Sequence, residues 1–445
     1  MRISVIGCGY LGAVHAAAMV SLGHDVIGID VDAEKVAALA RGDAPFFEPG
    51  LPELLAGGIA SGRLSFSTDP AAAAVASIHF LAIGTPQEAS GAADLSYLFA
   101  AVTSLLPILR EGDLVVGKST VPVGIAAQVA VVVESTGASL AWNPEFLREG
   151  LAIKDTLEPD RLVYGVREGD TRSVAALDEL YAGILAPGPP RMVTDFATAE
   201  LVKVAANAFL ATKISFINAM AEIAEVAGAD VTQLAEALGQ DPRIGRRFLN
   251  AGLGFGGGCL PKDIRGFIAR AEELGVGEAV GFLREVDAIN LRRRERVVQL
   301  VRAELGGQLS GRRIAVLGLA FKPDSDDVRD SPAIHVARRL LEEGADVAAH
   351  DPHAIETARR SFATLALDYR DDVQDAVADA EIVLVLTEWS EYRRLDPAGL
   401  AGRVRSRIIL DARNCLDADL WRAAGWRVIS LGRPVPAGAA VTQLA

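Results

Sequence analysis

The stretch GFGGGCLPKD, residues 254–263, places a cysteine between a glycine run and a predicted helix start. Pro261 fits the first helical turn, because its missing N–H costs nothing there. Cys259 would then sit at a helix N-terminus, where the dipole and free N–H groups favour a thiolate. The stretch therefore predicts a nucleophile at Cys259, with an inert buried cysteine as the alternative. Asp263, in the same first turn, could act on a water molecule or simply cap the helix.

Carboxylates and hydroxyls follow three other predicted strands. The stretch WNPEFLREG carries Glu145 and Glu149 four residues apart, and such a pair could supply a general base or orient a water molecule. The stretches GTP and STVPVG add the hydroxyls of Thr85 and Thr120 at strand ends, the edge at which open α/β sheets bind ligands. Solvated acids and ordinary strand-to-helix turns are the alternatives.

A long, mainly apolar helix is predicted from about residue 196 to residue 228. Glu200, Lys203 and Asn207 fall on one face of this helix. Polar groups in an apolar run need partners, and a positioned ammonium such as that of Lys203 can stabilise negative charge on a substrate oxygen. A helix that turns this face to water is the alternative.

Two further stretches indicate sites for a sugar or a phosphate. Five glycines between residues 252 and 258 predict a flexible backbone cradle for a sugar or a phosphate. The turn LGLAFKPDSDDVRDSPA lacks G-x-G-x-x-G, so we expect no second intact dinucleotide site there. Its Lys322 and Arg329 lie beside a helix start at Ser331 and predict a phosphate or diphosphate site, with a simple charged loop as the alternative.

The first strand-to-helix turn reads GCGYLG and matches the dinucleotide fingerprint G-x-G-x-x-G. Gly7 would permit the tight turn, Gly9 the close approach of a pyrophosphate, and Gly12 the packing of helix on strand. Asp30 ends the second strand, where its carboxylate can bind a ribose diol and repel a 2′-phosphate. NAD is therefore the expected cofactor. Lys35 contacts the cofactor or is a solvated helix lysine.

Short apolar runs alternate with helical patterns in both halves of the chain. This pattern predicts an α/β fold with two Rossmann-like doubly wound domains joined by a central helical domain with a long central helix. The expected domains cover residues 1–195, 196–308 and 309–445. The expected strands cover residues 2–7, 25–30, 78–84, 114–119 and 140–143, and then 313–318, 346–351, 381–388, 407–412 and 426–432.

Composition narrows the function classes. The 445 residues carry a formal net charge of −14, which argues against nucleic acid or an anionic membrane as a partner. The three cysteines are too few and too scattered for a disulfide framework or a zinc cluster, so we expect no metal. We expect a reduced, cytoplasmic setting without a signal segment or a transmembrane span.

Together these motifs resemble the UDP-glucose/GDP-mannose 6-dehydrogenase family over nearly the whole chain. The resemblance rests on GCGYLG, IGTP, STVPVG, NPEFLREG, ELVKVAANAFLATKISFIN, RIG…FL…GFGGGCLPKD and GLAFKPDSDDVRDSP. It implies an oxidoreductase that oxidises a sugar C6 alcohol twice with two NAD molecules, without releasing the aldehyde. In this reaction the cysteine attacks the aldehyde, the hemithioacetal loses a second hydride, and the thioester is hydrolysed to a uronate. Cys259 matches that nucleophile.

The resemblance implies roles for further residues. It assigns NAD binding to the first domain, dimerisation and catalysis to the central one, and UDP-sugar binding to the last. The residues matched to catalysis, beside the cysteine, are Lys203, Asp263, Asn207, Glu145 and Thr120. Those matched to NAD contacts are Gly7, Gly9, Tyr10, Leu11, Gly12, Asp30, Lys35, Thr85, Thr120, Glu149, Lys262 and Arg329. Those matched to nucleotide-sugar contacts are Glu145, Phe146, Leu147, Arg148, Glu149, Lys203, Asn207, Phe248, Leu249, Asn250, Gly252, Gly256 and Lys322. Arg243 matches an arginine that reaches the substrate from the partner subunit of a homodimer.

The chain departs from the family pattern at two positions. Many members read GFGGSCFPKD, so that Gly258 and Leu260 stand in place of a serine and a phenylalanine. The leucine also occurs in the GGSCLPKD run of GDP-mannose enzymes, whereas RIG…FL and FKPDSDDVRDSP favour UDP-glucose. We expect UDP-glucose as the substrate and UDP-glucuronate as the product, with GDP-mannose or a UDP-N-acetylhexosamine as alternative substrates. A single-step hydroxyacid dehydrogenase and a catalytically silent NAD or nucleotide-sugar sensor are the remaining alternatives.

Overall fold

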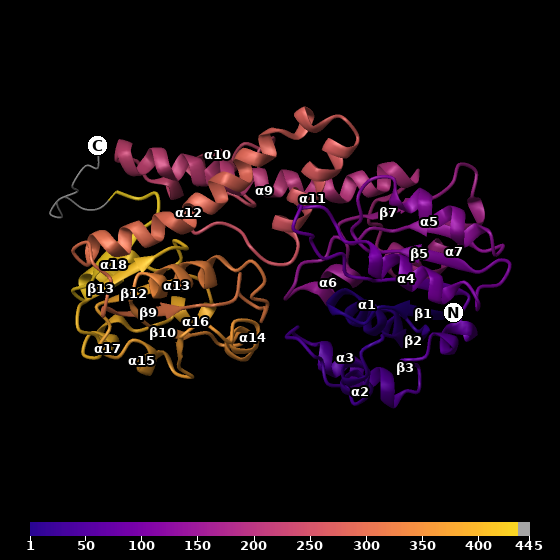
Figure 1. Cartoon of the computed structure of the whole chain (residues 1–445), viewed down its shortest axis with the longest axis horizontal. Coiled ribbons are helices and arrows are strands. Elements are labelled where there is room, and N and C mark those ends of the chain that lie inside the picture. Colours follow the sequence, from indigo (N-terminus) through magenta and orange to yellow (C-terminus); the bar gives the residue numbers. More distant parts are fainter. Residues whose placement is uncertain (435–445) are drawn as a thin grey trace. The chain divides into compact units, whose positions relative to one another are not determined.

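A computed structural model describes residues 1–434 of the chain. It divides into two compact units, shown as ribbons in Figure 1. Unit 1 holds residues Met1–Asn207 and Lys262–Ala279, and unit 2 holds Ala208–Pro261 and the chain from Val280 onwards. Residues 435–445 of the expected third domain lie outside the described range.

Unit 1 is built on an eight-stranded sheet with the strand order β3-β2-β1-β4-β5-β6-β7-β8. Its strands are β1 (Arg2–Ile6), β2 (Asp25–Ile29), β3 (Leu64–Ser67), β4 (Ile78–Leu81), β5 (Leu114–Gly117), β6 (Ser139–Trp142), β7 (Leu162–Gly165) and β8 (Arg191–Thr194). The first six strands are parallel and follow the order of doubly wound dinucleotide-binding sheets. Sequence analysis did not expect β3, β7 or β8, and β7 pairs antiparallel with β6.

Helices connect these strands. They are α1 (Tyr10–Ser21), α2 (Ala33–Ala40), α3 (Leu51–Ala60), α4 (Ser96–Leu105), α5 (Ile125–Glu134), α6 (Ala152–Leu157), α7 (Thr171–Leu180) and α8 (Ala182–Leu185). A 3-10 helix, η1, covers Pro70–Val75, where an alanine-rich run occurs. Helix α11 (Leu260–Glu273) also belongs to unit 1 from Lys262 onwards. The 3-10 helix η2 (Gly277–Val280) follows it.

Unit 2 contains a second, six-stranded sheet. Its strands are β9 (Arg313–Leu317), β10 (Asp346–His350), β11 (Asp368–Tyr369), β12 (Ile382–Val385), β13 (Ile408–Asp411) and β14 (Arg427–Ser430). They are all parallel and follow the order β11-β10-β9-β12-β13-β14, which repeats the arrangement of β1 to β6. The prediction of two doubly wound domains is therefore confirmed, although the two-residue β11 was not expected.

The helices of unit 2 fall into two groups. Those that connect the strands are α13 (Pro332–Glu342), α14 (Ile355–Ser361), α15 (Val373–Ala376), α16 (Ser390–Arg393), α17 (Pro397–Leu400) and α18 (Ala418–Ala423). The others are α10 (Val231–Gly239), α12 (Phe282–Glu304) and the second part of α9 (Phe196–Ala227), the predicted long helix. Helix α9 is the one described helix that is long and apolar enough to cross a membrane, a test that core helices of soluble proteins also pass.

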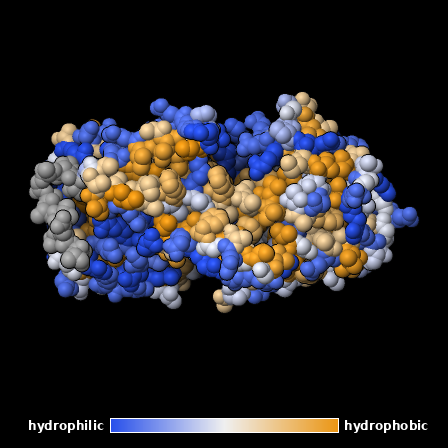
Figure 2. Space-filling model, turned by 90° about the horizontal axis from the view of Figure 1, so that it is seen from above, coloured by the Kyte–Doolittle hydropathy of each residue, from blue (hydrophilic) through white to orange (hydrophobic). Residues whose placement is uncertain are grey.

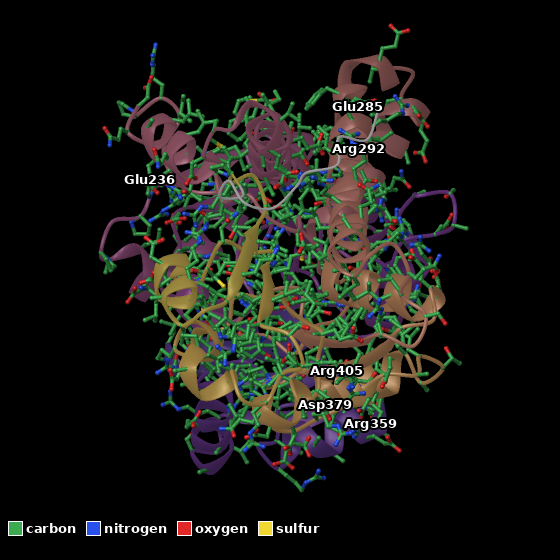
Figure 3. All side chains as sticks on the ribbon, turned by 90° about the vertical axis from the view of Figure 1, so that its left-hand side faces the viewer. Glu236, Glu285, Arg292, Arg359, Asp379 and Arg405 are labelled. Atoms are coloured by element: carbon green, nitrogen blue, oxygen red, sulfur yellow. The ribbon has the colours of Figure 1, made fainter. Side chains whose placement is uncertain are left out.

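Helices α9 and α12 lie side by side in unit 2 (Figure 1). The Ser215 hydroxyl of α9 donates to the Val286 carbonyl of α12 over 2.7 Å. Helix α12 is amphipathic, because its charged residues Glu285 and Arg292, labelled in Figure 3, are exposed whereas Val286 is buried. Both helices bind the loop that joins α10 to α11, through Asn218 of α9 and Asn290 of α12.

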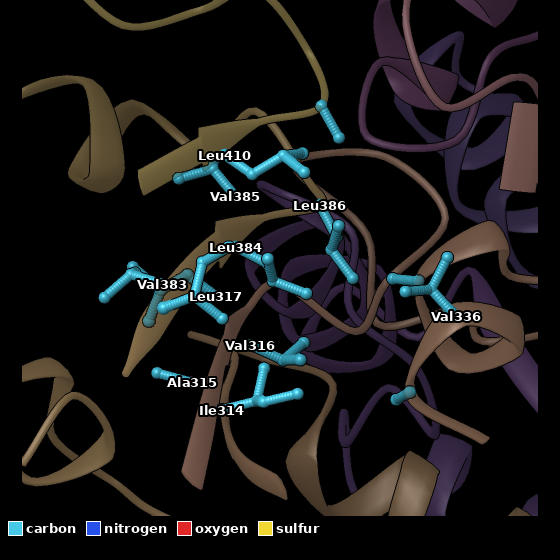
Figure 4. Close-up of a cluster of buried hydrophobic side chains, with 14 of the residues drawn as sticks. Ile314, Ala315, Val316, Leu317, Val336, Val383, Leu384, Val385, Leu386 and Leu410 are labelled. Carbon is cyan, nitrogen blue, oxygen red and sulfur yellow. The ribbon is translucent and has the colours of Figure 1, made fainter. Parts of the chain in front are cut away.

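The core of unit 2 lies around strands β9 and β12. Both strands are nearly continuous apolar runs because helices cover both faces of the sheet. Figure 4 shows Val316 and Leu317 of β9 beside Leu384 of β12, with Leu410 of β13 above them. The side chain of Leu384 is fully buried in this cluster.

We expect Leu384→Ala to lower the free energy of unfolding of unit 2 by about 2–5 kcal/mol, because it leaves a cavity in a close-packed core. Leu420→Ala is the matched control, since Leu420 lies on α18 with 53% of its side chain exposed. Urea unfolding followed by tryptophan fluorescence measures both. Equal midpoints for the two variants would contradict this view of the core.

Candidate active site

The turn after β1 has the geometry that a dinucleotide needs. Gly7 has a φ of +89°, and a Cβ there would lie 2.8 Å from the Ala82 carbonyl oxygen. A Cβ on Gly12 would lie 1.8 Å from the Gly7 oxygen, so that helix α1 packs closely on the turn. A Cβ on Gly9 would meet no atom within 4 Å, which leaves its backbone open to a ligand. The three glycines thus have the three properties that sequence analysis expected of them.

Asp30 directly follows β2 and lies beside this turn. Its carboxylate accepts hydrogen bonds from the backbone N–H of Cys8 over 2.8 Å and from that of Asp32 over 3.0 Å. The Lys35 ammonium binds the same carboxylate at 3.0 Å, so this lysine is paired rather than free in solvent. These residues fit the adenosine and pyrophosphate end of NAD, because an acceptor and an open glycine backbone lie at one sheet edge.

Tyr10 and Leu11, in the same turn, are partly buried against the core of unit 1. The Tyr10 hydroxyl donates to Glu48, a buried carboxylate that sequence analysis did not single out. Glu48 also accepts from the backbone N–H of Gly150 over 2.6 Å and of Ala152 over 2.8 Å. Glu48 therefore ties the dinucleotide turn to the end of the NPEFLREG loop, and its partners are too distant in sequence for any local pattern to indicate this.

A cluster of polar groups surrounds Asp263. Asp263 is buried and accepts from the Asn207 amide over 2.6 Å and from the Lys262 ammonium over 2.6 Å. Lys262 also lies 3.4 Å from the Thr85 hydroxyl, which donates to the Thr120 carbonyl over 2.9 Å. One pocket of unit 1 is lined by Thr85, Thr120, Lys262 and Asp263, among others. The structure thus brings together residues from four separate motifs.

The polar face of α9 points into the protein, not into water. Glu200, Lys203 and Asn207 are all buried, so the solvated alternative is wrong. Glu200 accepts from the backbone N–H groups of Gly124 and Ala126, each over 2.6 Å, and so caps the start of α5. Its role is structural, and burial raises the pKa of its carboxyl group. Lys203 lies with its ammonium 5.5 Å from the ring centre of Phe146.

Glu145 is held by donors of the chain itself. One carboxylate oxygen accepts from the backbone N–H groups of Phe146 and Leu147 over 2.7 and 3.1 Å. The other lies 3.0 Å from the buried Lys118 ammonium, which also donates to Asn143 over 3.1 Å. Lys118 and Asn143 were missed by sequence analysis, although a lysine at the end of a buried strand is a usable signal of a buried partner. A solvated loop acid is excluded for Glu145.

The rest of the NPEFLREG loop is more exposed. The ring of Phe146 also stacks under the guanidinium of Arg161, 4.0 Å away. Arg148 is exposed, and its guanidinium binds Asp155 over 2.7 and 2.8 Å. Glu149 is half-buried.

The glycine loop packs closely against the rest of unit 2. A Cβ at any of the five glycines between residues 252 and 258 would lie 2.7 Å or less from an atom of unit 2. The atoms met at positions 252, 254, 256, 257 and 258 belong to Ala412, Asn290, Asp330, Phe321 and Arg329. Gly252, Gly254, Gly256 and Gly257 therefore permit close packing of the chain on itself, and the ligand cradle stays a prediction.

Buried polar side chains fix the backbone of this loop. The Asn290 amide accepts from the Phe255 N–H over 2.8 Å and donates to the Phe255 carbonyl over 2.9 Å. Asn218 accepts from Gly252 N–H over 2.8 Å. Other donors to loop carbonyls are Arg294, Arg413 and Asn414. None of these residues stood out in the sequence, since each lies in an ordinary helix or strand end.

The remaining expected ligand residues of unit 2 are more dispersed. Leu249 is buried in a cluster with α9 and α10, and Phe248 before it has a φ of +67°. Asn250 is exposed and accepts from Arg246 over 2.8 Å. Arg243 is exposed and paired with Asp241. The Lys322 ammonium lies 5.5 Å from the ring centre of Phe321.

The turn after β9 is closed by the chain itself. Asp351, directly after β10, accepts from the backbone N–H groups of Leu319 and Ala320 over 2.7 and 2.9 Å. The Trp389 indole also donates to it over 3.2 Å. Asp351 thus occupies in unit 2 the sheet position that Asp30 occupies in unit 1.

The three cysteines differ in environment. Burial raises the pKa of the Cys8 thiol to about 12 and also raises that of Cys415. Cys259 is exposed and directly precedes α11, so the predicted helix start is confirmed. It is the cysteine placed to react.

A doubly wound NAD-type sheet with a polar pocket, followed by an exposed cysteine at a helix start, defines an NAD-dependent dehydrogenase. Models of three family domains match the chain: the NAD binding domain over residues 1–185, the central domain over 197–292, and the UDP binding domain over 315–418. The chain belongs to the UDP-glucose/GDP-mannose dehydrogenase family.

Individual relatives agree with this assignment. A UDP-glucose 6-dehydrogenase of Rhizobium meliloti is 41% identical over 98% of this chain and 100% of the relative. The solved structure of a UDP-glucose dehydrogenase from Pyrobaculum islandicum has a TM-score of 0.88 and 41% identity, over 97% of this chain and 98% of that chain. A UDP-D-ManNAc dehydrogenase from Pyrococcus horikoshii has a TM-score of 0.85 but 26% identity, over 97% and 99% of the two chains.

We expect Asp30→Asn to weaken NAD binding about tenfold, because a charged hydrogen bond to the ribose is lost. The preference for NAD over NADP should fall as well. Asp32→Asn is the control, since Asp32 caps the N–H groups of Glu34 and Lys35 instead. Titration of protein fluorescence with NADH gives both affinities, and an unchanged affinity in Asp30→Asn would refute the placement of the ribose.

Proposed function

We propose that this enzyme oxidises UDP-glucose at C6 to UDP-glucuronate, consuming two NAD⁺ and one water for each sugar. The observation that carries the proposal is the exposed Cys259 at the start of α11, a helix whose first turn supplies Lys262 and Asp263. Relatives named for UDP-glucose are 41% identical to this chain, whereas the relative named for UDP-D-ManNAc is 26% identical. The higher identity supports UDP-glucose over a UDP-N-acetylhexosamine. GDP-mannose is the other alternative.

We place the reaction in the cytoplasm, where thiols stay reduced.

The turn at Gly7 to Gly12 and Asp30 would hold NAD⁺, which when bound would supply the hydride acceptor for both oxidations at C6. Between them, the Cys259 sulfur adds to the C6 aldehyde carbon, and the carbonyl oxygen takes up a proton to complete the hemithioacetal. Loss of hydride and proton then gives a thioester. Water adds to the thioester carbon, the C–S bond breaks, and the uronate and the thiol are released. This covalent route retains the aldehyde on the enzyme.

Charged groups of unit 1 serve the oxygen chemistry in this proposal. The buried Lys203 ammonium stabilises negative charge on the C6 oxygen. Asp263, fixed by Asn207 and Lys262, orients the hydrolytic water. Glu145 is the general base, and Lys118 keeps its carboxylate in one orientation. Thr120 supports this group through its backbone carbonyl, which binds Thr85.

With limiting UDP-glucose, the native enzyme should yield two NADH for each sugar, measured by absorbance at completion. Cys259→Ser should yield at most one and lower kcat by at least about 10³-fold, because the thioester cannot form. Cys415→Ser, at a half-buried thiol, should still yield two. Two NADH from Cys259→Ser would overturn the mechanism. Two NADH from GDP-mannose, and few from UDP-glucose, would change the assigned substrate to GDP-mannose.

We also propose that the enzyme is a homodimer formed through α9. Phe209, Phe216, Ile223 and Val226 recur at helical spacing along its second part, and 48–91% of each is exposed. Figure 2 shows hydrophobic residues exposed on the face of the molecule that carries α9 and α12. An apolar stripe of this length on a surface favours burial against a second copy. The exposed Arg243 would reach the substrate of the partner.

Phe216→Glu should therefore give a monomer in light scattering after gel filtration, since it places a charge in the apolar stripe. The monomer should also have a raised KM for UDP-glucose, as should Arg243→Ala, if the arginine serves the partner's site. Glu236→Ala, on the exposed face of α10 in Figure 3, is the control and should remain dimeric. A dimeric Phe216→Glu would contradict the proposed interface.

A further inference from the structure

Position 258, where many family members carry serine, has its side-chain space filled by an arginine in this chain. A Cβ on Gly258 would lie 2.3 Å from Cζ of Arg329 and 2.5 and 2.6 Å from its two terminal nitrogens. The guanidinium therefore packs directly on the Gly258 backbone. A serine here would require the arginine to move away, which is sterically easy because the displaced atoms end a flexible side chain.

The guanidinium is anchored by its own loop. Its Nε donates to the two carboxylate oxygens of Asp327 over 2.9 and 3.0 Å, and Nη2 donates to Asp327 over 2.7 Å. The Arg329 carbonyl accepts from the Gly257 N–H over 2.9 Å. Next to it, Asp330 accepts from the buried Arg294 over 2.7 Å. The glycine loop thus holds the backbone of Arg329 and Asp327 holds its guanidinium, while 63% of the side chain is exposed.

This arrangement places a cation against the residue that immediately precedes Cys259. Asp327 offsets part of the arginine charge, Lys322 lies in the same loop, and the Lys262–Asp263 pair follows along the chain in the first turn of α11. A guanidinium cannot lose its charge at working pH, so the positive charge beside Gly258 is permanent. Together with the helix start, it favours the thiolate form.

We infer that Gly258 admits the Arg329 guanidinium to the glycine loop, and that Arg329 is a positioning residue that increases the thiolate fraction of Cys259. This inference rests on the proposed role of Cys259 as the nucleophile. It adds a function to Arg329 that acts in the absence of NAD, beyond the cofactor contact that the family resemblance implies. It also gives a physical reason for the departure from the serine pattern.

The test is the rate of Cys259 alkylation by iodoacetamide in the full-length enzyme, without sugar or NAD, followed by peptide mass spectrometry. Arg329→Gln should slow alkylation at pH 7 about three- to tenfold and move the midpoint of its pH profile up by roughly 0.5–1 unit. Gly258→Ser should produce the same change by displacing the guanidinium. The double variant should show no further change, because both substitutions remove one interaction.

Arg359→Gln is the matched control, since this arginine lies on the outer surface of unit 2 in Figure 3 and should leave the rate unaltered. Thermal unfolding midpoints verify that each variant is folded. Native rates in both Arg329→Gln and Gly258→Ser would overturn the inference, and so would additive effects in the double variant. Alkylation requires no turnover, so its result is independent of the NADH count that tests the proposed reaction.

Discussion

Steric exclusion in the segment from Gly252 to Gly258 is the constraint on which the site depends. Gly252, Gly254, Gly256 and Gly257 each face a backbone or packed side-chain atom of unit 2 at a distance that no methyl group could occupy, whereas Gly258 faces the movable end of Arg329. The backbone between them is bonded by Asn290 and Asn218, both fully buried. The segment that leads to Cys259 is therefore rigid for packing reasons, although its composition is typical of a flexible chain. Rigid placement is what a nucleophile at the end of a loop requires.

In unit 1, charged side chains of the site are held by ion pairs and hydrogen bonds to one another. Lys118 is bound to Glu145, and Asp263 is bound to Lys262 and Asn207. Desolvation of such charges is costly, so that these pairs are poor sources of stability. Their benefit lies in preorganisation, since the charges need not reorient when a substrate oxygen becomes negative.

The sequence predicted much of this fold because its strongest signals are local. Apolar runs predicted the central strands, the G-x-G-x-x-G spacing predicted the turn at Gly7, and Pro261 predicted the start of α11. The missed strands β3, β7, β8 and β11 are short, and exposed Met192 and Val193 of β8 lack the buried pattern. Groups such as Glu48 and Asn290 were missed because their partners lie 35 or more residues away. The close packing of the glycine loop could not be predicted, since its neighbours come from distant turns.

The closed turn after β9 has a kinetic consequence. Asp351 accepts from the N–H groups of Leu319 and Ala320, so these two donors of the turn after β9 are already satisfied within unit 2. In the proposed reaction both oxidations draw on the turn at Gly9, where a Cβ would meet no atom within 4 Å. In that reaction the first reduced cofactor departs, and a fresh one arrives, while the half-oxidised sugar stays tethered to Cys259. Cofactor exchange in mid-reaction thus becomes part of the catalytic cycle, and its rate sets how long the reactive carbon has to be shielded from water.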